Sequence, residues 1–82
     1  MATVQVSLTE SYQLVSSTSI LVSIAEIKKG TAMLVNDTST PASTVVGHSV
    51  PQGEPRVFPA PAAGNWYAKV TSDTATLAVT EV

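Results

Sequence analysis

The side chains that could carry out acid–base or nucleophilic chemistry are few and scattered. The chain has ten serines but one histidine, His48, and no Gly-x-Ser-x-Gly motif of the kind that presents a nucleophilic serine. A catalytic triad needs a nucleophile, a base and an orienting group. His48 alternates with Val46 and Val50 on a predicted strand, which is more typical of a core or interface histidine than of a catalytic base.

The carboxylates do not form a recognisable site either. Paired-carboxylate catalysis needs two acids in one cleft, and calcium and zinc sites have local spacings such as Asp-x-Asp or closely spaced His and Cys ligands. The acids here fall in separate segments, and the chain has no cysteine. We therefore expect no catalytic residue, no metal and no cofactor. The acids are Glu10, Glu26, Asp37, Glu54, Asp73 and Glu81.

The adjacent aromatic residues Trp66 and Tyr67 are candidates for recognition. On a strand their side chains point to opposite faces, so one of them should fill the core. If the other is exposed, it could stack on a sugar or anchor a protein contact. The alternative is that the proline-rich segment 55–61 covers both rings.

The length and composition limit the class of protein. A chain of 82 residues is enough for one domain, predicted to span residues 1–82, with a thin core. About 60% of the surface should be buried on folding, which is rarely enough for a deep substrate cleft. Charged residues make up 12% of the chain, about half of the usual ~25%. The net charge is −2, so we expect no nucleic-acid partner.

The sequence carries no signal for secretion or membrane insertion. No Lys or Arg precedes Lys28, and no apolar segment of the signal-peptide type follows the N-terminus. The longest apolar stretch, residues 20–27, is too short to span a bilayer. We expect no membrane partner, and synthesis in a cytoplasm that the chain leaves, if at all, inside a larger particle.

Alternation of apolar and polar residues predicts a series of short strands. Val4, Val6 and Leu8 show the pattern clearly, since a period of two is typical of a half-buried strand. Turn-forming segments recur every eight to twelve residues, a spacing that indicates a small antiparallel β-sandwich or barrel. We therefore predict an all-β, jelly-roll-like domain of seven to eight short strands. The predicted strands span residues 3–8, 12–16, 20–27, 31–35, 44–50, 56–58, 66–71 and 74–82.

Two tight turns are expected between neighbouring strands. The segment Lys28-Lys29-Gly30 lies between two apolar runs and indicates a hairpin, because glycine accepts the positive φ that such turns need. Ser72 and Asp73 fit a two-residue hairpin between the last two strands.

The first apolar run has a second interpretation. Ile20, Ile24 and Ile27 also fit helical spacing, with Ser19 as a cap and Gly30 as a stop, so a helix over this segment is the alternative. We favour the strand, because β-branched side chains lose rotamer freedom in a helix and fit well on a pleated sheet.

Assembly is the strongest inference from the residue pattern. Most predicted outward positions hold Ser, Thr, Ala or Val, although the exposed edges of a small sheet protein invite aggregation unless they are charged, bulged or covered. Such a surface suits burial against a partner better than exposure in a free monomer. We therefore predict a symmetric homo-oligomer docked on a larger scaffold. The candidate contact residues are Val4, Val6, Pro51, Pro55, Phe58, Pro59, Pro61, Trp66 and Tyr67.

The C-terminal half contains motifs that resemble one family. A loop ending in Gly53-Glu54 leads to the short segment Val57-Phe58, followed by a Gly-x-x-Tyr-Ala segment from Gly64 and an Ala-x-Leu-x-Val-x-Glu segment from Ala75. Over residues 44–82 this order resembles the small β-sandwich structural proteins of tailed bacteriophages. The resemblance implies a virion protein, either a capsid decoration (cement) protein or a head-fibre, tail or adaptor component. Such decoration proteins commonly bind capsid symmetry axes as trimers, and the resemblance carries over no catalytic residue.

These observations lead to one main functional hypothesis and an alternative. The main hypothesis is a non-enzymatic capsid decoration protein, located in the virion, that binds the outer shell as an oligomer, with a trimer favoured, and stabilises contacts between capsomers. Its partners would be itself and the major capsid protein or another virion protein. The alternative is a tail or head-fibre component, or a host-surface glycan-binding module that uses Trp66 or Tyr67. A small enzyme has no positive support in the sequence.

Overall fold

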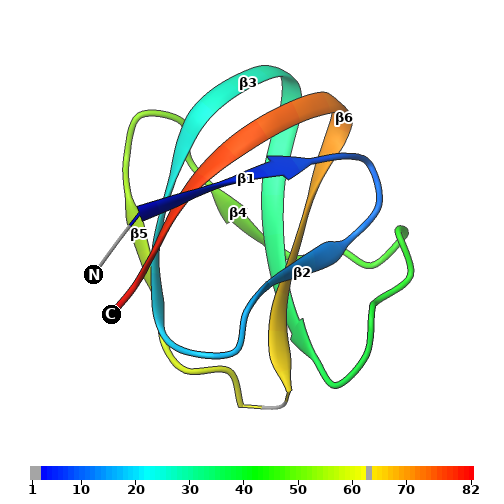
Figure 1. Ribbon diagram of the computed structural model, residues 1–82. Helices are drawn as coiled ribbons and strands as arrows, with labels where there is room; N and C mark the ends of the chain where they lie inside the picture. Colours follow the sequence, from blue (N-terminus) through cyan, green and yellow to red (C-terminus); the bar gives the residue numbers. More distant parts are fainter. Residues whose placement is uncertain (1–2, 63) are drawn as a thin grey trace.

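The protein is an all-β domain (Figure 1). The computed structural model describes residues 3–62 and 64–82, and within these ranges it contains six antiparallel strands and no helix. The alternative of a helix at residues 20–29 is therefore wrong. The strands are β1 (Thr3–Leu8), β2 (Gln13–Ser16), β3 (Ile20–Asp37), β4 (His48–Val50), β5 (Arg56–Phe58) and β6 (Asn65–Glu81).

The two long strands form the frame of the molecule. β3 and β6 pair with one another from Ile20 opposite Glu81 to Asp37 opposite Asn65, and both bend sharply near the middle. In Figure 1 they arch side by side over the top of the molecule. Each long strand therefore contributes one half to each of two packed sheets.

The short strands complete these two sheets. The first sheet has the order β1, residues 75–80 of β6, residues 20–27 of β3, and β5. The second has the order β2, residues 66–70 of β6, residues 32–37 of β3, and β4. If each half of a bent strand is numbered separately along the chain, the orders are 1-8-3-6 and 2-7-4-5. This is the double Greek-key arrangement of an eight-stranded jelly roll, so the predicted fold class is confirmed.

The two predicted hairpins are wrong, although both positions do have the positive φ that is expected of a turn. Gly30 and Asp73 have φ values of 76° and 63°, but the chain bends at each of them and does not reverse. Lys29 pairs with Ser72, and the register shifts on both sides of Lys29. A Cβ atom at Gly30 would collide with the side chain of Thr71, so glycine allows the two strands to approach closely at the corner.

The predicted strand over residues 44–50 is shorter than expected. Only His48–Val50 pair with β3, while residues 44–47 belong to the preceding loop and Val46 is 81% exposed. Gly47 fits tightly here, because a Cβ atom would lie 2.6 Å from the carbonyl oxygen of Leu34 and 3.0 Å from the hydroxyl of Tyr12. Close approach to Leu34 and Tyr12, which are distant in the sequence, therefore keeps residues 44–47 in a loop.

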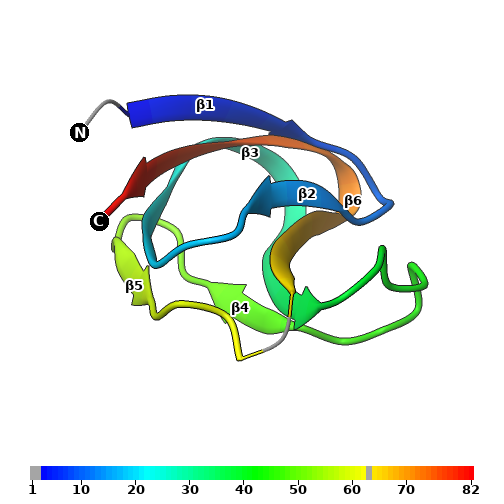
Figure 2. The same cartoon turned by 60° about the horizontal axis from the view of Figure 1, so that its bottom comes forward.

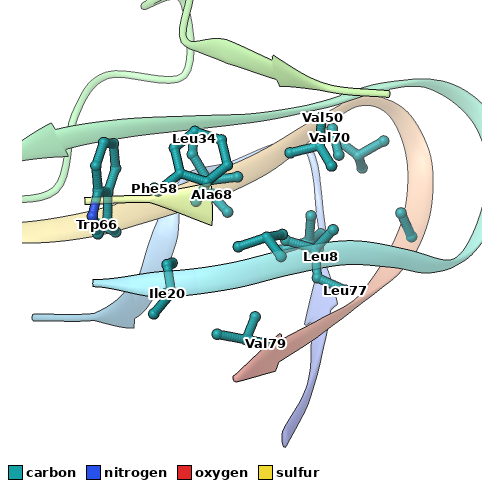
Figure 3. Packing of buried hydrophobic residues seen from close by; sticks show 13 residues of the cluster. Leu8, Ile20, Leu34, Val50, Phe58, Trp66, Ala68, Val70, Leu77 and Val79 are labelled. Atoms are coloured by element: carbon teal, nitrogen blue, oxygen red, sulfur yellow. The ribbon is translucent and has the colours of Figure 1, made fainter. Parts of the chain in front are cut away.

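Apolar side chains from both sheets fill the space between them (Figure 3). At one end of the core, Phe58 and Trp66 pack edge to face with their ring centroids 5.2 Å apart, and the indole Nε1 of Trp66 donates to the carbonyl of Pro59 at 2.9 Å. The buried cluster contains Leu8, Ile20, Val22, Ala32, Leu34, Val50, Phe58, Trp66, Ala68, Val70, Ala75, Leu77 and Val79. Among the described residues, no helix is long and apolar enough to cross a membrane.

Candidate functional site

The outer face of the first sheet carries small side chains and no cover from the rest of the described chain. We call it the open face and define it by the residues that alternate with the buried ones on β1, β3, β5 and β6. The register aligns Gln5, Ala78 and Ser23 in one row and Thr3, Thr80 and Leu21 in the next. The open face comprises Thr3, Gln5, Ser7, Leu21, Ser23, Val57, Thr76, Ala78 and Thr80.

None of these nine open-face residues is charged. Glu26 stands in the row of Thr76 and Ser7, so one exposed carboxylate does lie on this side of the sheet, at its end toward the bend. At the other margin Val57, on the edge strand β5, is 68% exposed. Uncharged, small side chains on a sheet lose little solvation when a partner covers them, which is typical of the central part of protein interfaces.

The loop of residues 38–47 covers part of the outer face of the second sheet, while Leu14, which pairs with Tyr67 at the edge strand β2, is 59% exposed. The hydroxyl of Tyr12 donates to the carbonyl of Val45 at 2.6 Å, and Nζ of Lys69 donates to the carbonyl of Ser43 at 2.5 Å. Nζ of Lys69 also lies 5.7 Å from the centroid of the Tyr12 ring, within range of a cation–π interaction. Burial raises the pKa of Tyr12 above its usual value, because the phenolate would be poorly solvated here. We call this surface the covered face.

A groove runs between the edge strands β4 and β5, which lie next to one another in Figure 2. It consists of two hollows of about 420 and 380 Å³ that share His48, Ser49 and Arg56 in their walls. Both hollows are shallow and open. We call it the β4–β5 groove.

A smaller hollow of about 220 Å³ lies at the opposite edge of the sandwich, between β1 and β2. It is lined by Val4, Val6, Val15, Val79 and Glu81. The carboxylate of Glu81 accepts a hydrogen bond from the hydroxyl of Ser16 at 2.7 Å, so its charge is engaged by a neighbouring strand.

The contact residues predicted from the sequence lie on several different parts of the molecule. Val4 is 58% exposed and Val6 is half-buried in the smaller hollow. Pro51 and Pro59 line the β4–β5 groove. Pro55 is exposed and Pro61 half-buried, whereas Phe58, Trp66 and Tyr67 are buried. These residues form no single surface, and their role in contacts remains a prediction.

The two adjacent aromatic residues point to opposite faces, as predicted. Trp66 is 3% exposed and lies in the core beside the proline-rich segment, whereas Tyr67 lies on the covered face and is 7% exposed. Neither ring is therefore an exposed platform. The sequence analysis missed Tyr12 and Lys69, because a local pattern does not reveal that a distant loop folds over a sheet.

The described residues contain no group of three or more His, Asp or Glu side chains that could hold a metal ion. Several carboxylates instead bind neighbouring backbone or hydroxyl groups. Asp37 accepts from the amide of Thr38 at 2.7 Å, and Glu10 accepts from the amide of Asp73 at 3.2 Å. The first of these fits the turn-forming habit of Asp, and the second connects the first loop to the bend.

Comparison of the chain with protein-family models, with curated proteins and with solved structures finds no match in any of the three.

Proposed function

We propose that this chain is a non-enzymatic structural subunit of a virion, a capsid decoration protein that docks on the outer shell as an oligomer, with a trimer favoured. In this proposal the chain stabilises contacts between neighbouring capsomers by burying surface at many repeated sites. Its partners are further copies of itself and the major capsid protein.

The observation that carries the proposal is the low charge of the open face, where Glu26, at the end toward the bend, is the one charged residue among the described positions. The row formed by Gln5, Ala78 and Ser23 spans three strands, and the face presents small hydroxyl, amide and apolar groups. A freely dissolved sheet protein is normally kept apart from its copies by charges on such a surface. A subunit whose sheet is covered in an assembly has no such need.

Two of the exposed apolar residues, Val57 and Val4, add to this support, whereas Leu14, Val45 and Val46 are exposed on the other sheet and its loop. Val57 lies at the margin of the open face, and Val4 lies at the opposite edge of the same sheet. Apolar area at the rim of a flat face of low charge extends the surface that a docked partner would cover.

The main experiment counts the chain in purified particles and finds its position there. Hundreds of copies distributed over the shell are expected, whereas a handful of copies at the tail would contradict decoration and favour a fibre or adaptor role. Size-exclusion chromatography with light scattering measures the isolated chain, and a trimer is expected. A stable monomer at high concentration would contradict the oligomer.

A pair of variants connects this result to the open face. Ala78→Lys places a charge at the centre of the face, whereas Val46→Lys places the same charge on an exposed residue of the loop over the other sheet. Ala78→Lys should keep the fold but abolish binding to the particle, and Val46→Lys should bind as the wild type does. Equal binding of both variants would exclude the open face as the docking surface.

The alternative of a glycan-binding module that uses Trp66 or Tyr67 loses its structural basis, because both rings are buried. A glycan array with the wild-type chain tests this alternative directly. If glycan binding is lost in Tyr67→Ala but retained in Ala78→Lys, the glycan-binding alternative would be favoured over the decoration proposal.

A further inference from the structure

The β4–β5 groove brings together the histidine and the arginine of the chain. Alternation along each strand explains their orientation. His48 precedes the buried Val50 by two residues, and Arg56 precedes the buried Phe58 by two residues, so both side chains lie on the same side of their strands as the core residues but are exposed at the edge of the sandwich. Because β4 and β5 are edge strands of different sheets, His48 and Arg56 line the opening between the sheets from opposite sides.

The charge of this groove is unbalanced. Arg56 is permanently positive. Among the described residues that line the two hollows there is no Asp or Glu. Nor does any described residue form an ion pair or a side-chain hydrogen bond with Arg56. An exposed guanidinium group next to apolar walls interacts most favourably with a carboxylate, which it binds through two parallel hydrogen bonds.

The backbone of the groove walls adds a second kind of recognition. In the described part of the chain, β4 pairs on one side with residues 32–34 of β3, and β5 pairs on one side with residues 20–22 of the same strand. Their other edges carry no strand and flank the groove. A strand edge of this kind accepts an extended peptide through main-chain hydrogen bonds.

Proline residues limit the length of such pairing. Pro51 follows β4, while Pro55 and Pro59 flank β5. Since proline has no backbone N–H, each of these edges offers only about three residues for pairing. The groove therefore fits a short extended segment and not a full additional strand.

The remaining walls of the groove supply apolar contacts on both sides of the charged centre. One hollow is lined by Ile24 and Ile27, and the other by Val57 with the Phe58 and Trp66 rings at its base. A ligand that spans both hollows therefore places an anionic group between two apolar positions. Saccharides match this less well, because Trp66 is buried and offers no exposed ring on which a sugar could stack.

We infer that the β4–β5 groove binds a short extended peptide segment of a partner protein, with an Asp or Glu side chain of that segment paired to Arg56 and apolar side chains in the flanking hollows. This inference does not rest on the proposed function, since the groove and the open face adjoin at Val57 but Arg56 and Ala78 lie on only one of them each.

The experiment selects peptides from a displayed library of random seven-residue sequences against the immobilised wild-type chain. The enriched peptides are then synthesised and titrated while the fluorescence of Trp66 is recorded, because this residue is the one tryptophan of the chain and lines the groove. Enriched peptides should contain Asp or Glu beside apolar residues. Selection of no peptide, or of peptides without an acid, would overturn the inference.

The matched variants are Arg56→Gln and Lys29→Gln, which remove one positive charge inside and outside the groove. Arg56→Gln should weaken binding at least about tenfold, the loss expected for a charge-assisted hydrogen bond, and Lys29→Gln should bind as the wild type does. Circular dichroism and melting curves verify the fold of both variants. Replacing Glu by Gln in the peptide makes the same test without altering the protein, and unchanged affinity in either test would overturn the inference.

An array of carboxylated and sulfated glycans is tested in parallel. If these glycans bind in a way that depends on Arg56 and no peptide is selected, the inference of a peptide ligand would be overturned. The groove would then be assigned to an anionic saccharide. Loss of particle binding in Ala78→Lys with intact peptide binding would separate the open face from the groove, so the failure of one proposal is distinguishable from the failure of the other.

Discussion

The outer faces of the two sheets differ in their side chains and in what lies over them. The covered face holds the large residues Tyr12 and Lys69, and the loop of residues 38–47 is hydrogen-bonded to both. The open face holds mostly Thr, Ser, Gln and Ala at the corresponding outward positions, together with Leu21 and Val57. The two faces belong to different halves of the same long strands, β3 and β6, and they differ in their outward residues and in the loop that lies over one of them.

This difference predicts that the residues of the covered face contribute to the stability of the fold, whereas those of the open face contribute to contacts with partners. On the covered face, large side chains are buried within the chain, so their substitution should reduce the free energy of unfolding. On the open face, substitutions should leave the free energy of unfolding almost unchanged and affect only what the protein binds. The following experiments test this division, beginning with the largest expected effect.

Tyr12→Ala should lower the free energy of unfolding by about 3 kcal/mol, because it removes a buried aromatic ring and leaves a cavity under the loop. The hydrogen bond to the carbonyl of Val45 is lost as well. Urea denaturation followed by circular dichroism measures the change. Val46→Ala in the same loop is the control and should stay within about 0.5 kcal/mol, since Val46 is 81% exposed. A loss below 1 kcal/mol for Tyr12→Ala would mean that the loop adds little to stability.

Gly47→Ala should cost about 2 kcal/mol, because the new methyl group would lie 2.6 Å from the carbonyl oxygen of Leu34 and force the loop away from the sheet. Gly53→Ala is the comparison. Nothing lies within 4 Å of a Cβ atom there, but its φ of 86° disfavours alanine by about 1 kcal/mol. Melting temperatures of the two variants give the order. A smaller effect at Gly47 than at Gly53 would contradict tight packing of the loop.

Tyr12→Phe should cost about 1 kcal/mol at neutral pH, the contribution of one hydrogen bond. Since the pKa of Tyr12 is raised in the folded protein, the neutral phenol is favoured on folding. The associated stability is fully present below the unfolded pKa of about 10 and is lost as the pH rises through the folded pKa. Denaturation from pH 8 to pH 11 should therefore show a steeper alkaline loss for the wild type than for Tyr12→Phe. Parallel curves would contradict the burial of this hydroxyl.

Thr80→Ala should have the smallest effect, within about 0.5 kcal/mol, because exposed hydroxyl pairs contribute little in water. The substitution removes a contact of 2.6 Å between the hydroxyls of Thr3 and Thr80 on the open face. The same denaturation assay measures it. A loss comparable to that of Tyr12→Phe would show that the open face contributes to folding as the covered face does.

Much of the fold follows from local patterns in the sequence. The alternation of Val4, Val6 and Leu8 and the proline residues around Arg56–Phe58 predict β1 and β5 at their correct positions. The eight predicted segments correspond to the eight positions of the jelly roll, because each long strand has two of them. Local patterns do not reveal that two pairs of these segments are continuous in the long strands β3 and β6. A positive φ at Gly30 or Asp73 fits a turn or a bend equally well, and only the pairing of β3 with β6 decides between them.

The surfaces are harder to predict than the strands for the same physical reason. The low charge that suggests assembly is visible in the composition, and the open face has Glu26 as its one charged residue among the described positions. By contrast, Phe58, Trp66 and Tyr67 were expected as contacts because they are large, and they are buried. The proximity of His48 to Arg56 depends on two edge strands from different sheets, which no spacing along the chain reveals.

The position of β6 at the centre of both sheets has a consequence for the order of folding. β1, β2 and β3 all pair with β6, which is the last strand of the chain. None of these pairings can form during synthesis until residues 65–81 have left the ribosome. The native contacts are thus largely nonlocal, and high contact order of this kind is associated with folding times of roughly milliseconds to seconds. The domain should therefore fold cooperatively, as one unit, only after β6 has been synthesised.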